Sequence, residues 1–292
     1  MKPKINEMLS NHTTFKIGGS ANFFFEPKTI EELRKAITFA KKNKLKLLIL
    51  GAGSNLLISD KGFSGCVIKP SMQKILIDER EVEVEAGVPL AKLINVLAEK
   101  GLCGLEFLAG IPGSLGGAIL MNAGAKENEI GNIVDKVWTL DLSGREKVFT
   151  KKASKFGYRG SIFQKGGYVI TKATFILNKK EPEKIKAKIK KILDDRLTRQ
   201  PYDLPSAGSV FKNPLGDFAG RLIESAGFKG KRVGDAMVSP KHCNFIVNMG
   251  HAKYNEVFML INAIKYEVKK RFGVALELEI KCIMDYHENE KR

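Results

Sequence analysis

Three short stretches of the chain carry polar side chains in places where packing does not require them. The first is Gly-Tyr-Arg-Gly-Ser at 157–161, in which Arg159 follows the aromatic Tyr158 within a glycine-flanked bend. A guanidinium held in such a bend can bind a carboxylate through two parallel N–H···O bonds. Taken alone, an arginine of this kind is more often a solvated loop residue.

The second stretch, at 206–214, places a serine directly after a glycine. Gly208 gives the backbone freedom just before Ser209, and Lys212 and Asn213 follow closely as potential ligands for an oxyanion or a phosphate. No histidine lies nearby in the sequence, so a nucleophilic triad has little support. A serine-capped turn is the structural alternative.

The third stretch, Leu276–Ile280, alternates apolar and acidic residues with the period of a β-strand. Glu277 and Glu279 would then share one face of that strand. A solvated edge strand is the alternative that needs no chemical role.

Two glycine-rich loops, at 51–57 and 110–118, lie about sixty residues apart, each after an apolar run or a helix. Glycines let the backbone approach an anion closely, and Ser54, Asn55 and Ser114 add hydrogen-bond donors. Neither loop is a standard nucleotide motif: Leu56 stands where the dinucleotide pattern needs its third glycine, and neither ends in Gly-Lys-Ser/Thr. Either loop alone is more often a tight turn, but the pair predicts a large cofactor that bears phosphate.

The elements that must position these residues follow from capping signals and hydrophobic periodicity. A capping box at Thr29–Glu32 starts a helix, and Pro89 opens another that ends before Gly101. Strands are predicted at 45–50, 66–69, 81–85, 133–140, 168–177, 244–248 and 274–283, and further helices at 182–199, 218–226 and 254–271. Because strands and helices do not alternate regularly, the predicted fold class is α+β.

The composition of the chain changes near residue 180. A long basic helix follows, then a loop at 201–214 that is rich in glycine and proline and could carry function. We therefore expect a domain boundary near residue 180.

The formal charge of +17 permits nucleic-acid binding, but the lysines are spread along the chain. Their densest run, at 184–193, has isoleucines and a leucine at helical spacing, which favours a solvated lysine face. No run approaches the ~20 apolar residues of a membrane span, and the first residues lack the apolar core of a signal peptide. The four cysteines form no Cys-x-x-Cys pair and the four histidines no metal-ligand spacing, so no metal is expected.

Eight stretches in order resemble the UDP-N-acetylenolpyruvoylglucosamine reductase, or MurB, family. They are HTTFKIGG at 12–19, GAGSNLLISDKGFSG at 51–65, GIPGSLGGAILMNAGA at 110–125, YRGSIF at 158–163, AGSVFKNP at 207–214, AGRLIESAGFKG at 219–230, HCNFIVN at 242–248 and LELEIK at 276–281. The resemblance spans nearly the entire chain. The short segment from Phe163 to Tyr168 leaves no room for the inserted tyrosine loop of one branch, so the chain is similar to the shorter branch.

The resemblance implies a two-subdomain FAD-binding domain of the vanillyl-alcohol oxidase (PCMH) type at 1–180, with subdomains of about 1–70 and 71–180, and an α+β substrate-binding domain at 181–292. It implies reduction of UDP-N-acetylglucosamine enolpyruvate to UDP-N-acetylmuramate in cytoplasmic peptidoglycan precursor synthesis. NADPH would donate the hydride to noncovalently bound FAD. The partner would be the UDP-sugar, with no nucleic acid and no membrane, and the protein would be a monomer.

Carried over by motif, the catalytic residues would be Arg159, Ser209 and Glu279. The residues that bind the cofactor would be Gly51, Ala52, Gly53, Ser54, Asn55, Leu56, Gly110, Pro112, Gly113, Ser114, Gly117, Ala118, Asn122 and Ile170, and those that bind the substrate Tyr158, Lys212, Asn213 and Asn244. Two alternatives remain at this point: another FAD-linked oxidoreductase of the same fold, and a nonenzymatic basic binding module suggested by the net charge.

Overall fold

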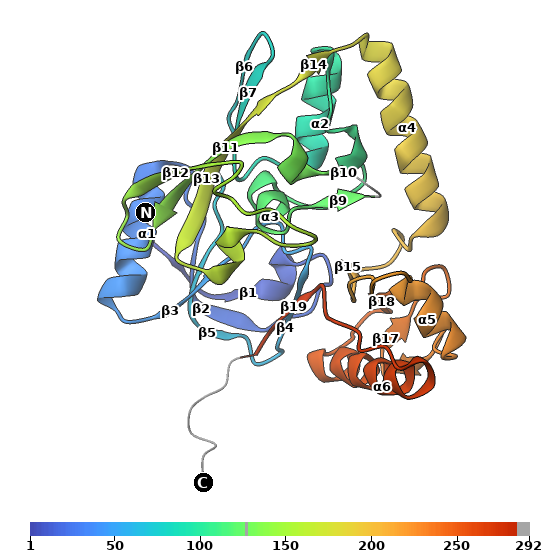
Figure 1. Cartoon of the computed structure of the whole chain (residues 1–292). Coiled ribbons are helices and arrows are strands. Elements are labelled where there is room, and N and C mark those ends of the chain that lie inside the picture. Colours follow the sequence, from blue (N-terminus) through green and yellow to red (C-terminus); the bar gives the residue numbers. More distant parts are fainter. Residues whose placement is uncertain (126–127, 285–292) are drawn as a thin grey trace. The chain divides into compact units, whose positions relative to one another are not determined.

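The computed structural model describes residues 1–125 and 128–284, and the chain forms two compact units (Figure 1). The first unit comprises residues 1–4, 23–52 and 65–196, and the second comprises 5–22, 53–64 and the chain from Leu197 onward. This division does not coincide with a single boundary near residue 180. Helix α4 (Pro182–Arg199) belongs to the first unit because its Ile185 and Ile189 are buried in the core of that unit.

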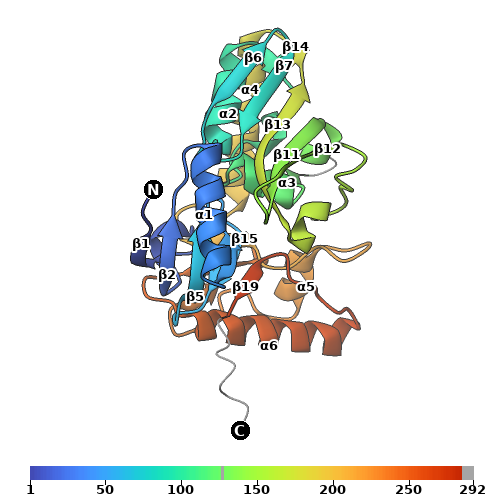
Figure 2. The ribbon, with the colours of Figure 1, turned by 90° about the vertical axis from the view of Figure 1, so that its left-hand side faces the viewer.

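The first unit contains a five-stranded antiparallel sheet with the strand order β12-β11-β13-β7-β6 (Figure 2). The strands are β6 (Ile75–Asp78), β7 (Glu81–Glu85), β11 (Val134–Asp141), β12 (Glu146–Thr150) and β13 (Tyr168–Ile176). The predicted alternation along 81–85 is confirmed, because Val82 and Val84 are fully buried between glutamates. Helices α2 (Leu90–Glu99), α3 (Leu115–Leu120) and α4 contribute apolar residues to the same core.

A second core of the first unit lies under helix α1 (Ile30–Lys42). Thr29 caps this helix by accepting a hydrogen bond from the backbone N–H of Glu32, as the capping signal predicts. Leu33, Ala36, Ile37 and Ala40 pack against residues of β2 (Ser20–Phe25) and β5 (Phe63–Ile68), and Figure 2 shows α1 lying along these strands. Strand β3 (Lys46–Ile49) pairs in parallel with β5 and leads directly into the first glycine loop.

The second unit contains a four-stranded antiparallel sheet with the order β15-β18-β17-β16 and two helices. The elements are β15 (Ser206–Ser209), α5 (Ala219–Ser225), β16 (Arg232–Val233), β17 (Ala236–Val238), β18 (Phe245–Asn248) and α6 (Tyr254–Phe272). The buried face of α6 supplies much of the apolar core. A parallel pair, β4 (Leu56–Ile58) with β19 (Lys281–Ile283), joins the first glycine loop to the end of the described chain.

Most predicted elements are present, but the predicted strand at 274–283 is wrong over most of its length. Only β19 and a single bridge at Leu278 are extended pairs. Leu276 and Ile280 are both buried, as in a strand, but the N–H groups of Glu279 and Ile280 both donate to the carbonyl of Val210, which is not the pattern of a regular strand. The sequence also did not indicate several other elements. They include β2, β6, β12, β16 and β17 as well as β1 (Lys4–Met8), β8 (Leu102–Cys103), β9 (Gly124–Ala125), β10 (Asn128–Glu129), β14 (Asn178–Lys179) and 3-10 turns at Leu9–His12, Glu106–Leu108, Ile130–Asn132 and Ile162–Lys165.

Candidate functional site

The start of the first glycine-rich loop meets the second loop within the first unit. A Cβ atom placed on Gly51, just after β3, would stand 2.9 Å from Ser114 Oγ and 3.7 Å from the Cα of Gly117 in α3. Residues separated by more than sixty positions in sequence are therefore close neighbours in the fold. This proximity is what a single ligand held by both loops requires.

The glycines of these loops differ in what constrains them. At Gly53, φ is +67° and a Cβ would stand only 2.1 Å from the carbonyl oxygen of His12, so packing within the protein already requires glycine there. At Gly117 a Cβ would meet only Ser114 Oγ, at 3.6 Å, so the protein's own packing leaves that side of the backbone open. Gly110 has φ +79°. An open glycine beside a buried serine fits the close approach of a phosphate-bearing cofactor.

Some of the other first-unit residues that the family resemblance assigns to the cofactor are buried. Ala118 and Ile170 are 4% and 6% exposed and belong to the apolar core, so they offer a ligand little surface. Pro112 is exposed and Gly113 half-buried. The backbone N–H groups of Leu115 and Gly116 donate to the carbonyls of Val88 and Ala86.

The first glycine loop passes from one unit to the other between Ala52 and Gly53. In the second unit, the side-chain Nδ2 of Asn55 donates to the carbonyl of Glu279 at 3.0 Å, and the carbonyl of Asn55 accepts from the N–H of Lys281 at 3.0 Å. Leu56 continues this pairing as the first residue of β4. Asn55 thus fixes the backbone of Glu279, a relation that the sequence did not predict.

Arg159 lies in a tight two-residue turn of the first unit. Gly157 and Gly160 exchange both backbone hydrogen bonds at 3.0 Å, and Arg159 between them has φ +53°. A left-handed conformation costs a residue with a side chain about 1–2 kcal/mol, and such strain collects at functional sites. The guanidinium lies 5.1 Å from the ring centroid of Tyr158, and its Nη2 donates to the carbonyl of Gly124 at 3.3 Å.

Ser209 and Glu279 occupy adjoining backbone segments of the second unit. Ser209 ends β15, and the next residue, Val210, accepts a hydrogen bond from the N–H of Glu279 at 2.9 Å. Phe211 forms a bridge with Leu278, and Lys212 donates its N–H to the carbonyl of Glu277. Two of the three expected catalytic residues are therefore brought together from positions seventy apart in the sequence.

The expected substrate-binding residues of the second unit have different surroundings. Lys212 Nζ lies 3.3 Å from Glu277 Oε2, and Asn213 Oδ1 accepts the N–H of Ala219 at the start of α5. Asn244 is 3% exposed: its Oδ1 accepts the N–H of Phe211 at 2.9 Å and its Nδ2 donates to the carbonyl of Phe211 at 2.8 Å. Asn244 therefore holds the backbone two residues beyond Ser209.

We expect Asn244→Ala to lower the free energy of unfolding by about 2–4 kcal/mol, because it leaves a buried N–H and a buried carbonyl of Phe211 without partners. Urea denaturation would measure the loss. Asn262→Ala, on the exposed side of α6, is the matched control and should change stability little. An Asn244→Ala protein as stable as the wild type would show that the two hydrogen bonds to Phe211 do not stabilise the fold.

Burial also sets the ionisation of nearby groups. His242 accepts the N–H of Asn244 at its Nδ1 and packs edge-on against Phe245, and burial lowers the pKa of His242. Burial raises the pKa of Cys66 to about 11 and raises the pKa values of Cys243 and Cys282. These thiols are protonated at neutral pH, as expected of small core residues.

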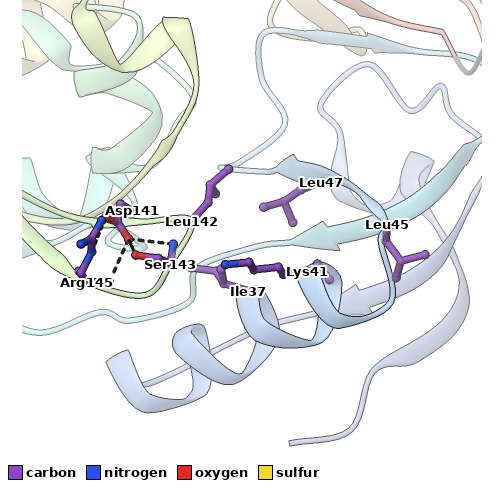
Figure 3. A pocket seen from close by; sticks show the side chains of 9 residues that line it. Ile37, Lys41, Leu45, Leu47, Asp141, Leu142, Ser143 and Arg145 are labelled. Carbon is purple, nitrogen blue, oxygen red and sulfur yellow. Dashed lines mark hydrogen bonds and ion pairs between the residues drawn. The ribbon is translucent and has the colours of Figure 1, made fainter.

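A hollow of about 500 Å³ lies in the first unit between α1 and the turn that joins β11 to β12 (Figure 3). Its lining is Ile37, Ala40, Lys41, Leu45, Leu47, Asp141, Leu142, Ser143 and Arg145. Asp141 accepts hydrogen bonds from the Ser143 hydroxyl and from the backbone and side chain of Arg145, and these bonds hold its pKa well below the usual range. The carboxylate thus serves the turn, and no expected site residue lines the hollow.

Within residues 1–125 and 128–284, no helix is long and apolar enough to cross a membrane. The same residues contain no cluster of three or more His, Cys, Asp or Glu side chains that could hold a metal ion. His287 lies outside the described residues.

Comparison with known proteins places these features in a family. Residues 21–145 match the model of an FAD binding domain, and residues 200–283 match that of the C-terminal domain of UDP-N-acetylenolpyruvoylglucosamine reductase. The reductase of Halalkalibacterium halodurans is 42% identical over 96% of this chain and 94% of its own length, and that of Lachnoclostridium phytofermentans is 44% identical over 95% and 92%. The crystal structure of the Thermus caldophilus enzyme superposes with a TM-score of 0.84 at 35% identity, covering 97% of this chain and all of that one, which confirms the α+β class. The chain belongs to the UDP-N-acetylenolpyruvoylglucosamine reductase family.

Proposed function

We propose that this protein reduces UDP-N-acetylglucosamine enolpyruvate to UDP-N-acetylmuramate with NADPH, in the synthesis of peptidoglycan precursors. The observation that carries the proposal is the match of 96% of the chain, at 42% identity, to relatives named for this reductase. The proximity of Gly51 to Ser114 and Gly117 in the first unit supports it, because this reaction needs a redox cofactor. The protein works in the cytoplasm as a monomer.

FAD is the cofactor, and residues of the loops at 51–56 and 110–118 hold it without a covalent bond. When bound, FAD would supply the hydride transfer from NADPH to the substrate. Neither loop contains a histidine or cysteine that could attach to the ring system. Residues within 1–180 serve the cofactor, and residues within 181–292 that include Lys212 and Asn213 serve the UDP-sugar.

Side chains of the protein stabilise the negative charge that develops on the substrate and donate the proton. Hydride addition at the terminal carbon of the enolpyruvyl group moves negative charge toward the substrate carboxylate. Arg159 binds that carboxylate and stabilises the enolate-like intermediate. Glu279 assists only if it is protonated or hydrogen-bonded, because a free carboxylate would repel the same charge.

Ser209 then donates a proton to the carbon that bears the ether oxygen. A serine hydroxyl is a weak acid, so the intermediate must be strongly basic for this transfer to proceed. The position of Ser209 beside the segment of Glu279 supports a joint role for these residues. Lys212 is paired with Glu277 and so is a less direct donor.

The test is NADPH oxidation by the purified protein, with and without the enolpyruvyl UDP-sugar. We expect a yellow protein whose steady NADPH consumption depends on the sugar and yields UDP-N-acetylmuramate. NADPH consumption that the sugar does not stimulate would favour another FAD-linked oxidoreductase. A colourless protein that binds no FAD would favour the basic binding module.

A further inference from the structure

Asn122, which follows helix α3, has a side-chain amide that the protein itself occupies. The residue is 1% exposed, and its Nδ2 donates to the carbonyl of Gly157 at 2.9 Å and to Glu129 Oε2 at 2.6 Å. Its Oδ1 accepts the N–H of Gly131 at 2.9 Å. An asparagine amide has two N–H donors, and both are used here. Asn122 therefore has no donor left for a cofactor, although the family resemblance places it among the cofactor-binding residues.

The carbonyl that Asn122 holds belongs to the turn that carries Arg159. The Gly157 carbonyl also accepts the N–H of Gly160 at 3.0 Å, which closes this turn. Arg159 inside it is in the left-handed region, and its carbonyl accepts from Gln164 Nε2 at 3.0 Å. A strained turn persists only where its surroundings hold it. Gln164 is exposed, whereas Asn122 is buried, so Asn122 is the more rigid of these two supports.

We propose that Asn122 is a positioning residue whose amide fixes the turn of Arg159, and through it the guanidinium that receives the substrate carboxylate. This inference rests on the proposed function of Arg159. It also connects α3, which begins within the second glycine loop, to the residue that stabilises charge on the substrate. The physical reason is that a small displacement of a charge-stabilising group greatly weakens its effect in the transition state.

The most direct variant is Asn122→Gly. Asn122 itself has φ +46°, so glycine keeps the backbone conformation while it removes the amide. Stopped-flow absorbance separates reduction of the flavin by NADPH from its reoxidation by the enolpyruvyl sugar. We expect unchanged FAD content and flavin reduction, and reoxidation slower by about tenfold or more. Glu79→Gly, at a left-handed position (φ +48°) in the turn between β6 and β7, is the matched control and should leave both rates unchanged.

A double-mutant cycle shows whether Asn122 acts through Arg159. If it does, Asn122→Gly should slow reoxidation no further in an Arg159→Ala background, because the two residues then affect one interaction. Additive effects would overturn the proposal, and so would loss of FAD from Asn122→Gly, which would make Asn122 a cofactor ligand. If Asn122→Gly does not fold, Asn122→Asp keeps the acceptor but loses both donors, and the same slow reoxidation is expected.

Amide hydrogen exchange provides a readout that does not depend on catalysis. We expect the N–H of Gly160 to exchange faster in Asn122→Gly than in the wild type, because the turn loses its buried support. Unchanged exchange would overturn the proposal. If the wild-type flavin is not reoxidised by the enolpyruvyl sugar, the proposed function fails, but the exchange measurement still decides whether Asn122 holds the turn.

Discussion

Ser209→Ala should leave reduction of the flavin by NADPH intact and slow its reoxidation by the enolpyruvyl sugar by at least about 100-fold, the usual scale for loss of a positioned acid. The reason is that only the second half-reaction needs a proton at the substrate carbon. Stopped-flow absorbance of the flavin measures the two halves separately. Ser209→Cys should keep part of the second rate, because a thiol is also a proton donor.

Ser206→Ala is the matched control for this prediction. Ser206 begins the same strand, β15, and its hydroxyl accepts only a long hydrogen bond from the N–H of Gly208, at 3.4 Å. Ser206→Ala should change neither half-reaction.

If Ser209 only caps a turn, Ser209→Ala should cost roughly 1 kcal/mol of stability and affect both half-reactions alike. Reoxidation at the wild-type rate would assign the proton to another donor, with Lys212 or water as the next candidates.

Arg159→Lys should also spare flavin reduction and lower the rate of reoxidation by about 10²–10³-fold, the scale for loss of one preorganised stabiliser of an oxyanion. Lysine keeps the positive charge but lacks the planar fork that binds a carboxylate through two hydrogen bonds. Because lysine and arginine both carry an unbranched side chain at Cβ, the left-handed backbone is disturbed equally little. Single-turnover kinetics over a range of sugar concentrations would separate binding from the chemical step.

The larger effect should fall on the chemical step, because the charge that Arg159 stabilises grows in the transition state. Arg145→Lys, in the turn between β11 and β12, is the control: this arginine is largely exposed and pairs with Asp141. It should leave both half-reactions unchanged. An Arg159→Lys enzyme that binds the sugar weakly but reacts normally once saturated would restrict Arg159 to substrate binding.

The sequence by itself determined the local elements and the family. Helix α1 follows from a capping box and α2 from Pro89 and Gly101, and the buried valines of β7 follow from an alternating pattern. These signals are local, because each depends on residues within a few turns of one another. The family followed from eight ordered motifs, whose joint occurrence is far more specific than either glycine loop.

Tertiary structure alone decided which segments meet. The amide of Asn55 reaches the carbonyl of Glu279, 224 residues away, and Asn244 holds the backbone of Phe211 from 33 residues away. In the same way α4 joins the first unit because its isoleucines complete that core. The segment before β19 is not a regular strand because the N–H groups of Glu279 and Ile280 both donate to the carbonyl of Val210. A buried amide gives no periodic signal in the sequence, since its partner is a backbone group that any residue type can supply. What such an amide holds is therefore fixed only when the chain has folded and brought that backbone group within hydrogen-bond distance.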